Sequence, residues 1–96
     1  MPLLICKRVI YYSQNDELVF FDWLKRIKCI KEIKGIRDEL HLHATRWISD
    51  TGLRDLLAIF ERYKIDMKQL AQFSSERNRM WFQDDEKKYW HKKIFG

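Results

Sequence analysis

The clearest pattern in this chain is a helical repeat of apolar residues in its second half. Leucine and phenylalanine recur at i, i+3, i+4 and i+7 over positions 53–60, as one face of an α-helix requires. Ser49 or Asp50 can cap this helix, which we expect to run to about Tyr63. Residues 14–28 predict an earlier helix, because Ser13 offers a capping hydroxyl and apolar residues again follow helical spacing. Its apolar positions are Leu18, Phe20, Phe21, Leu24 and Ile27.

Three other segments predict strands. Residues 3–12 are apolar on both parities, which favours a strand covered on both faces. Residues 29–34 are short and β-branched, and residues 39–44 alternate with Leu40, Leu42 and Ala44 inward. These last two segments predict a hairpin that turns at residues 35–38. Asp66 can cap a further short helix over residues 67–73.

The order of these elements predicts an α+β fold. A right-handed crossover through the first helix, followed by a hairpin, places the third strand between the first and the second. This is the split β-α-β arrangement of ferredoxin-like domains, with helices packed on one face of three or four strands. Residues 88–95 are the remaining segment that could add a fourth strand beside the first, although Trp81, Phe82 and Tyr89 could instead cover the sheet as loop or helix. Without a fourth strand, that edge is a candidate site for homodimer formation.

Composition indicates a globular protein. The 96 residues are expected to form one domain, 1–96, and no run approaches the roughly 20 apolar residues of a membrane-spanning helix. A cytoplasmic protein without membrane contact is therefore expected. Cys6 and Cys29 are expected to be free and buried, although they could meet across adjacent strands.

Known catalytic and cofactor patterns are absent from the sequence. Three glycines cannot supply a phosphate-binding loop, and the Ser and Thr hydroxyls lie where caps and loops use them. His41 and His43 share one face of a strand, but a metal site needs a third ligand, such as His91 or Glu39, that nothing in the sequence brings there. We therefore expect no enzyme activity, no metal and no cofactor.

The last twenty residues, 77–96, combine aromatic rings with basic charge. They hold 6 of the 19 Lys and Arg residues and 3 of the 14 Asp and Glu residues, while the net charge of the whole chain is +5. Because large rings rarely remain in water, this segment should dock on its own domain, on a partner protein or on nucleic acid. The side chains that we expect to contact a partner are Arg77, Arg79, Trp81, Trp90, Lys92 and Lys93. The leading hypothesis is protein binding, and the alternative is a small RNA- or DNA-binding protein that uses the same segment.

Two stretches, SDTGLRDLLAIFERYKIDMKQLAQF and YWHKKIFG, resemble small bacterial immunity proteins of contact-dependent growth inhibition systems. The resemblance implies a cytosolic protein that binds one cognate toxin and blocks its active site or its substrate path. Such proteins have many unrelated folds and no shared motif, so no functional residue is carried over. Inhibitors of basic nucleases tend to be acidic, whereas this chain is basic, so its toxin would have to present an acidic surface.

Overall fold

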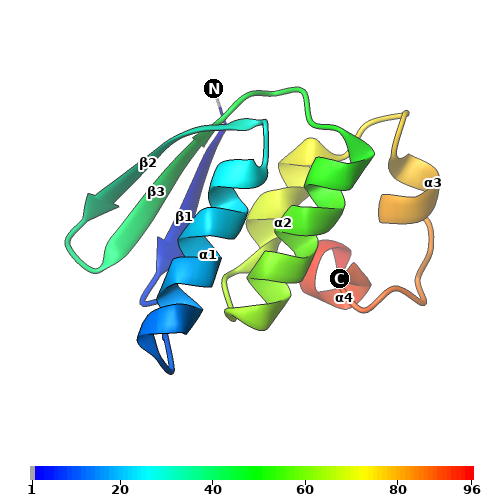
Figure 1. Cartoon of the computed structure of the whole chain (residues 1–96). Coiled ribbons are helices and arrows are strands. Elements are labelled where there is room, and N and C mark those ends of the chain that lie inside the picture. Colours follow the sequence, from blue (N-terminus) through cyan, green and yellow to red (C-terminus); the bar gives the residue numbers. More distant parts are fainter. Residues whose placement is uncertain (1) are drawn as a thin grey trace.

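The computed structural model describes residues 2–96, which form a three-stranded sheet with helices on one face (Figure 1). The elements follow the order predicted from the sequence as far as the end of the short third helix. They are β1 (Leu3–Lys7), α1 (Gln14–Arg26), β2 (Ile30–Ile36), β3 (Glu39–Ala44), α2 (Asp50–Arg62), the 3-10 helix η1 (Met67–Phe73), α3 (Arg79–Phe82) and α4 (His91–Phe95).

The sheet has the order β1-β3-β2, with both neighbouring pairs antiparallel. The third strand therefore lies between the first two, which confirms the split β-α-β prediction. Leu42 is opposite Leu4 on one side and Ile33 on the other, and all three side chains belong to the helix-covered face. The hairpin turns at Arg37, whose φ of 59° supplies the left-handed residue that a tight turn uses.

The two main helices begin where their caps predict. The Ser13 hydroxyl accepts a hydrogen bond from the Asp16 N–H (3.1 Å), and the Ser49 hydroxyl accepts one from the Gly52 N–H (3.0 Å). Each hydroxyl satisfies a backbone donor that the first helical turn leaves free. The apolar faces of α1 and α2 then close the core over the sheet. Its fully buried members include Phe20, Leu24, Leu53, Leu56, Leu57 and Phe60.

The first strand is shorter than predicted, and only one of its faces is covered. It ends at Lys7, because Arg8 adopts a φ of 51° that no continuing strand allows. Leu4 and Cys6 are fully buried on the helix side, whereas Leu3 on the opposite side is 40% exposed. Beyond Lys7 the chain forms a loop in which Val9 and Tyr11 pack against the core, whereas Ile10 and Tyr12 are exposed. The apolar pattern of this part therefore reflects core contacts at two positions and not a strand.

Residues 88–95 do not supply a fourth strand. Residues 91–95 are helical, and the outer edge of β1 is occupied by a side chain of η1 instead. The Ile5 N–H donates to Gln69 Oε1 (2.6 Å), and Gln69 Nε2 donates to the Ile5 carbonyl (2.8 Å). One amide group thus forms the two hydrogen bonds that a neighbouring strand would form. The self-association edge predicted beside the first strand is therefore already occupied at its centre.

The C-terminal segment packs against α2 and η1, and its rings form a second part of the core. Phe82 is fully buried, Trp90 is 7% exposed, and the Trp90 indole N–H donates to the Phe82 carbonyl (2.8 Å). Phe95 meets Phe82 edge to face, with ring centroids 5.1 Å apart. The segment is therefore helix and loop, but its rings pack beside α2 and η1 and do not cover the sheet, and Tyr89 is 52% exposed.

The cysteines are free and buried, as expected. They do not lie on adjacent strands: Cys6 is opposite Leu40 at one end of β3, while the Cys29 carbonyl accepts from the Thr45 N–H just beyond the other end. Among residues 2–96, no helix combines the length and apolar character needed to span a membrane.

Candidate functional site

Trp47 is the most exposed of the four tryptophans and lies in the short loop between β3 and α2. It is 62% exposed, whereas the other three are half-buried or buried. The loop is held at both ends, because the Thr45 hydroxyl donates to the Trp47 carbonyl (2.9 Å) and Ser49 caps α2. A large ring is therefore presented to solvent from a backbone that is already ordered, which reduces the entropy lost on binding.

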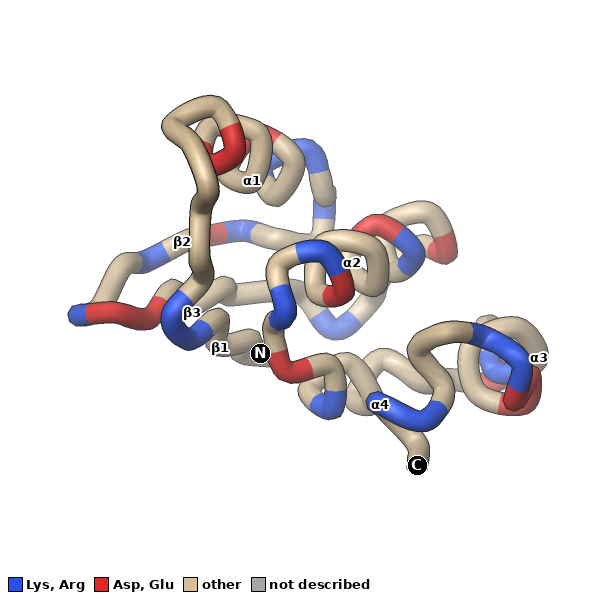
Figure 2. Tube along the Cα trace, turned by 90° about the horizontal axis from the view of Figure 1, so that it is seen from below, with Lys and Arg blue, Asp and Glu red and all other residues tan. Residues whose placement is uncertain are grey.

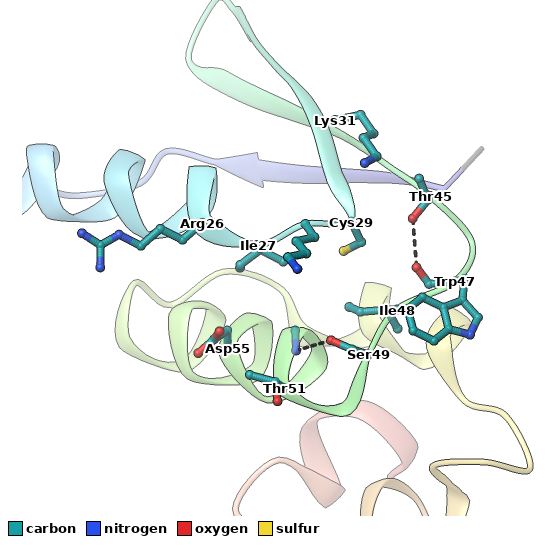
Figure 3. Close-up of a pocket in the computed structure, with 12 residues that line it drawn as sticks. Arg26, Ile27, Cys29, Lys31, Thr45, Trp47, Ile48, Ser49, Thr51 and Asp55 are labelled. Atoms are coloured by element: carbon teal, nitrogen blue, oxygen red, sulfur yellow. Dashed lines mark hydrogen bonds between the residues drawn. The ribbon is translucent and has the colours of Figure 1, made fainter.

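A hollow of about 500 Å³ lies on one side of this loop (Figure 3). It separates the end of α1 and the start of β2 from the first turn of α2. Ile27 and Ile48 supply apolar surface, and Thr51 and Ser49 supply hydroxyls at the mouth. Its cationic residues are Arg26, Lys28 and Lys31. The hollow therefore suits an apolar side chain flanked by negative groups.

A second hollow, of about 420 Å³, lies between the same loop and the segment that follows η1. Arg46 and Arg77 line it together with polar groups of Ser74, Ser75 and Asn78. The Arg77 guanidinium carbon is 5.6 Å from the centroid of the Trp47 ring, within range of a cation–π contact. We refer to Trp47 and the residues of the two hollows as the Trp47 surface.

The Trp47 surface carries more positive than negative side chains. Five cationic residues line it, against two carboxylates. The cations are Arg26, Lys28, Lys31, Arg46 and Arg77, and the carboxylates are Asp50 and Asp55. Arg26 also pairs with Asp22 (3.0 Å) on the exposed side of α1, where both partners face water. Elsewhere, Lys and Arg positions are spread along the chain rather than gathered on one element (Figure 2).

The six residues predicted as partner contacts do not form one surface. Arg77 joins Trp47, whereas Arg79 pairs with Asp84 (3.3 Å) beside α3. Lys93 pairs with Glu61 of α2, and Lys92 is exposed. The basic groups are thus divided among separate parts of the C-terminal segment.

The two predicted tryptophans have mainly structural environments. Trp90 is a core residue, so a partner could touch its ring only if that ring left the core. Trp81 is half-buried and lies edge to face with Trp90, with ring centroids 6.0 Å apart. The Arg54 guanidinium carbon is 4.3 Å from the centroid of the Trp81 ring and shields that face from water. Both rings therefore join the C-terminal segment to the rest of the protein.

Trp47 is not among the side chains predicted from the sequence as partner contacts, which all belong to residues 77–96. One signal was present: Trp47 stands between the end of an alternating strand and the Ser49 cap, so it belongs to a short connection. Connections between elements run over the surface, and a large ring there has little of its own chain to pack against.

The buried cysteines and His41 have distinct surroundings. Burial raises the pKa of the Cys6 thiol to about 12 and also raises the pKa of Cys29, so both remain protonated near neutral pH. His41 Nε2 lies 3.1 Å from Glu39 Oε1 on the open face of the sheet. Within residues 2–96, no three His, Cys, Asp or Glu side chains gather closely enough to hold a metal ion.

The arrangement therefore offers a preformed aromatic and cationic surface that suits binding. Compared with known proteins, the chain matches no family model, no curated protein and no solved structure.

Proposed function

We propose that this protein acts by stoichiometric binding to a partner protein and that Trp47 is the centre of the contact. The observation that carries the proposal is the 62% exposed ring, held on an ordered loop between two hollows. Trp and Arg are the side chains most enriched at binding hot spots, and both are present here. The ring would fill a cavity of the partner, while the hollows would receive side chains from it.

The positive charge of the Trp47 surface indicates what kind of partner surface would bind there. Five cations against two carboxylates favour an acidic surface with an apolar side chain near its centre. The resemblance to immunity proteins implies a toxin as that partner, bound and neutralised in the cytoplasm. An acidic toxin surface would also account for a basic inhibitor.

Nucleic acid is the second candidate, because cations beside an exposed ring can also hold a phosphate chain and one base. Single-strand binding surfaces usually stack several bases on neighbouring rings. Here the other strongly exposed rings, Tyr12 and Tyr89, belong to the loop before α1 and to the C-terminal segment. The Trp47 surface therefore fits a protein contact better.

The test is copurification of the full chain from its source cell, followed by titration with the purified partner. Trp47→Ala should weaken binding at least 30-fold, about 2 kcal/mol, as expected for a hot-spot tryptophan. Tyr12→Ala is the matched control, because it removes another exposed ring, 85% exposed, from outside this surface. Equal affinity of the Trp47→Ala variant and the control would refute the proposed contact.

A parallel titration with mixed oligonucleotides separates the two candidates. Protein binding through Trp47 should depend weakly on salt, whereas nucleic-acid binding should fall steeply as counterions are released. Tight oligonucleotide binding that Trp47→Ala abolishes would replace the protein-binding proposal by the second candidate.

A further inference from the structure

The two edges of the sheet differ in how their backbone groups are satisfied. On β1, the Ile5 N–H and carbonyl point away from β3, because both bond to Gln69. Backbone groups alternate in direction along a strand, so His41 of β3 directs its own groups toward Lys34 of β2. The next residues of β2, Ile33 and Gly35, therefore direct their N–H and carbonyl groups outward.

The outer edge of β2 has no internal partner comparable to Gln69. Among residues 2–96, no side chain is hydrogen-bonded to the backbone of Ile33 or Gly35, and β2 is the outermost strand on its side of the sheet (Figure 1). Such an edge is a template for one additional strand. Since Gln69 occupies the β1 edge, pairing of two molecules through their β2 edges would give a closed dimer. Further copies could not add to form a continuous sheet.

We propose that a second copy of this chain binds at the β2 edge. The two β2 strands would pair antiparallel about Ile33 to form a twofold dimer with one continuous six-stranded sheet. Ile33 faces Ile33 of the other molecule, and their outward backbone groups bond to each other. The contact lies along β2 and goes beyond the proposed function; it shares Lys31 with the Trp47 surface but does not include the Trp47 ring.

Charge complementarity selects both the partner and the register. Glu32 and Lys34 flank Ile33 on the open face of the sheet, and each is more than half exposed. Within one molecule Lys34 Nζ lies 3.5 Å from Glu32 Oε1, so the dimer would extend this exposed pair into a group of four alternating charges. Pairing about Ile33 places Glu32 directly opposite Lys34 of the other molecule, and the twofold axis repeats this pair. Pairing about Glu32 or Lys34 instead would set like charges opposite each other, which is unfavourable.

The helix-covered side of the edge adds apolar surface to the same contact. Phe21 lines a hollow with Gly35, and Lys25 lines another with Ile33, so this side of α1 faces the β2 edge. Leu18, three residues before Phe21 on the same side of the helix, is 59% exposed. In the dimer, the two α1 helices lie over the paired strands, and the side chains of Leu18 and Phe21 become more buried.

The edge also has a feature that restricts other pairings. The register of β2 against β3 shifts between Ile30 and Glu32, which leaves Lys31 in a bulge. In the register about Ile33, Lys31 stands opposite Gly35, which has no side chain of its own and where a Cβ would only reach ordinary contact with Leu40 Cδ2, at 3.9 Å. A lysine in a bulge hinders the approach of most additional strands, but a glycine directly across from it leaves room for the lysine side chain.

The test is a charge exchange, measured as dimerisation by sedimentation from about 10 μM to about 1 mM. Glu32→Lys and Lys34→Glu each turn two attractive cross-strand pairs into repulsive ones, and each should weaken dimerisation about tenfold. The double variant Glu32→Lys/Lys34→Glu restores both pairs and should dimerise within about threefold of the unaltered protein. Because both positions are more than half exposed, all three variants should fold, which circular dichroism can verify.

The two single variants change the net charge in opposite directions. General repulsion between basic molecules would make Lys34→Glu dimerise more tightly, whereas edge pairing predicts that both variants dimerise less. A monomeric unaltered protein throughout this range would overturn the proposal. Single variants that dimerise as tightly as the unaltered protein would also overturn it, as would a double variant that dimerises no more tightly than the single variants. The Trp47→Ala variant should dimerise as the unaltered protein does. A failure of the dimer proposal can therefore be distinguished from a failure of the protein-binding proposal.

Discussion

Replacing Gln69 with alanine removes the side chain that occupies the outer edge of β1. The substitution eliminates the hydrogen bonds of 2.6 and 2.8 Å to the Ile5 backbone and leaves both backbone groups without this partner. At about 1 kcal/mol for each bond, the free energy of unfolding should fall by about 2 kcal/mol. For a chain of 96 residues, this corresponds to a decrease in Tm of about 10 °C.

Urea denaturation followed by tryptophan fluorescence measures this change, and the denaturant slope should remain constant if only stability has altered. Gln72→Ala is the matched control, because Gln72 lies in the same helix, is exposed and makes one hydrogen bond within η1. Its effect should stay below about 0.5 kcal/mol. Equal stabilities of the two variants would show that the Gln69 amide does not substitute for a fourth strand.

Three further substitutions or treatments address the core and its titratable groups. Trp90→Ala should lower the free energy of unfolding by about 3–5 kcal/mol in a denaturation experiment, because a buried ring and its indole hydrogen bond are lost together. Asp16→Asn should destabilise the protein at pH 7, and urea titrations at decreasing pH should show that this difference shrinks once the pH is below the unfolded pKa. Hydrogen bonds from the Tyr12 N–H and the Tyr63 hydroxyl hold the pKa of Asp16 below its usual value. Their contribution is complete above the unfolded pKa, near 4, and is lost as the pH falls through the folded pKa. Cys6 should react with a thiol reagent at pH 8 only after denaturation, because it is fully buried and its pKa is raised to about 12.

Each of these outcomes has a direct control. Tyr89→Ala removes a neighbouring ring that is 52% exposed, so it should cost much less than Trp90→Ala. If the two cost the same, the Trp90 ring is not a core element. A difference between the Asp16→Asn variant and the unaltered protein that stays constant as the pH falls below the unfolded pKa would contradict the pKa argument. Rapid reaction of Cys6 in the folded protein would contradict its burial.

The sequence by itself determined the local elements and their order as far as η1. The helical repeat over residues 53–60 and the Ser49 cap place α2, and the alternation over residues 39–44 places β3. These signals depend on neighbouring residues and backbone geometry, so they are visible without tertiary contacts. Strand order followed from the handedness of the crossover, which is also a general rule.

Only the tertiary structure decided which surfaces are closed and which remain open. Trp47, Trp81 and Trp90 have the same chemistry, but the Trp90 ring packs against Trp81, Phe82 and Tyr89, whereas Trp47 lies in a loop and is 62% exposed. Likewise, Gln69 of η1, 64 residues after its partner Ile5, occupies the edge of β1 where the sequence allowed a fourth strand. Contacts between residues so distant in the chain depend on how the whole core fills its volume, which no local pattern records.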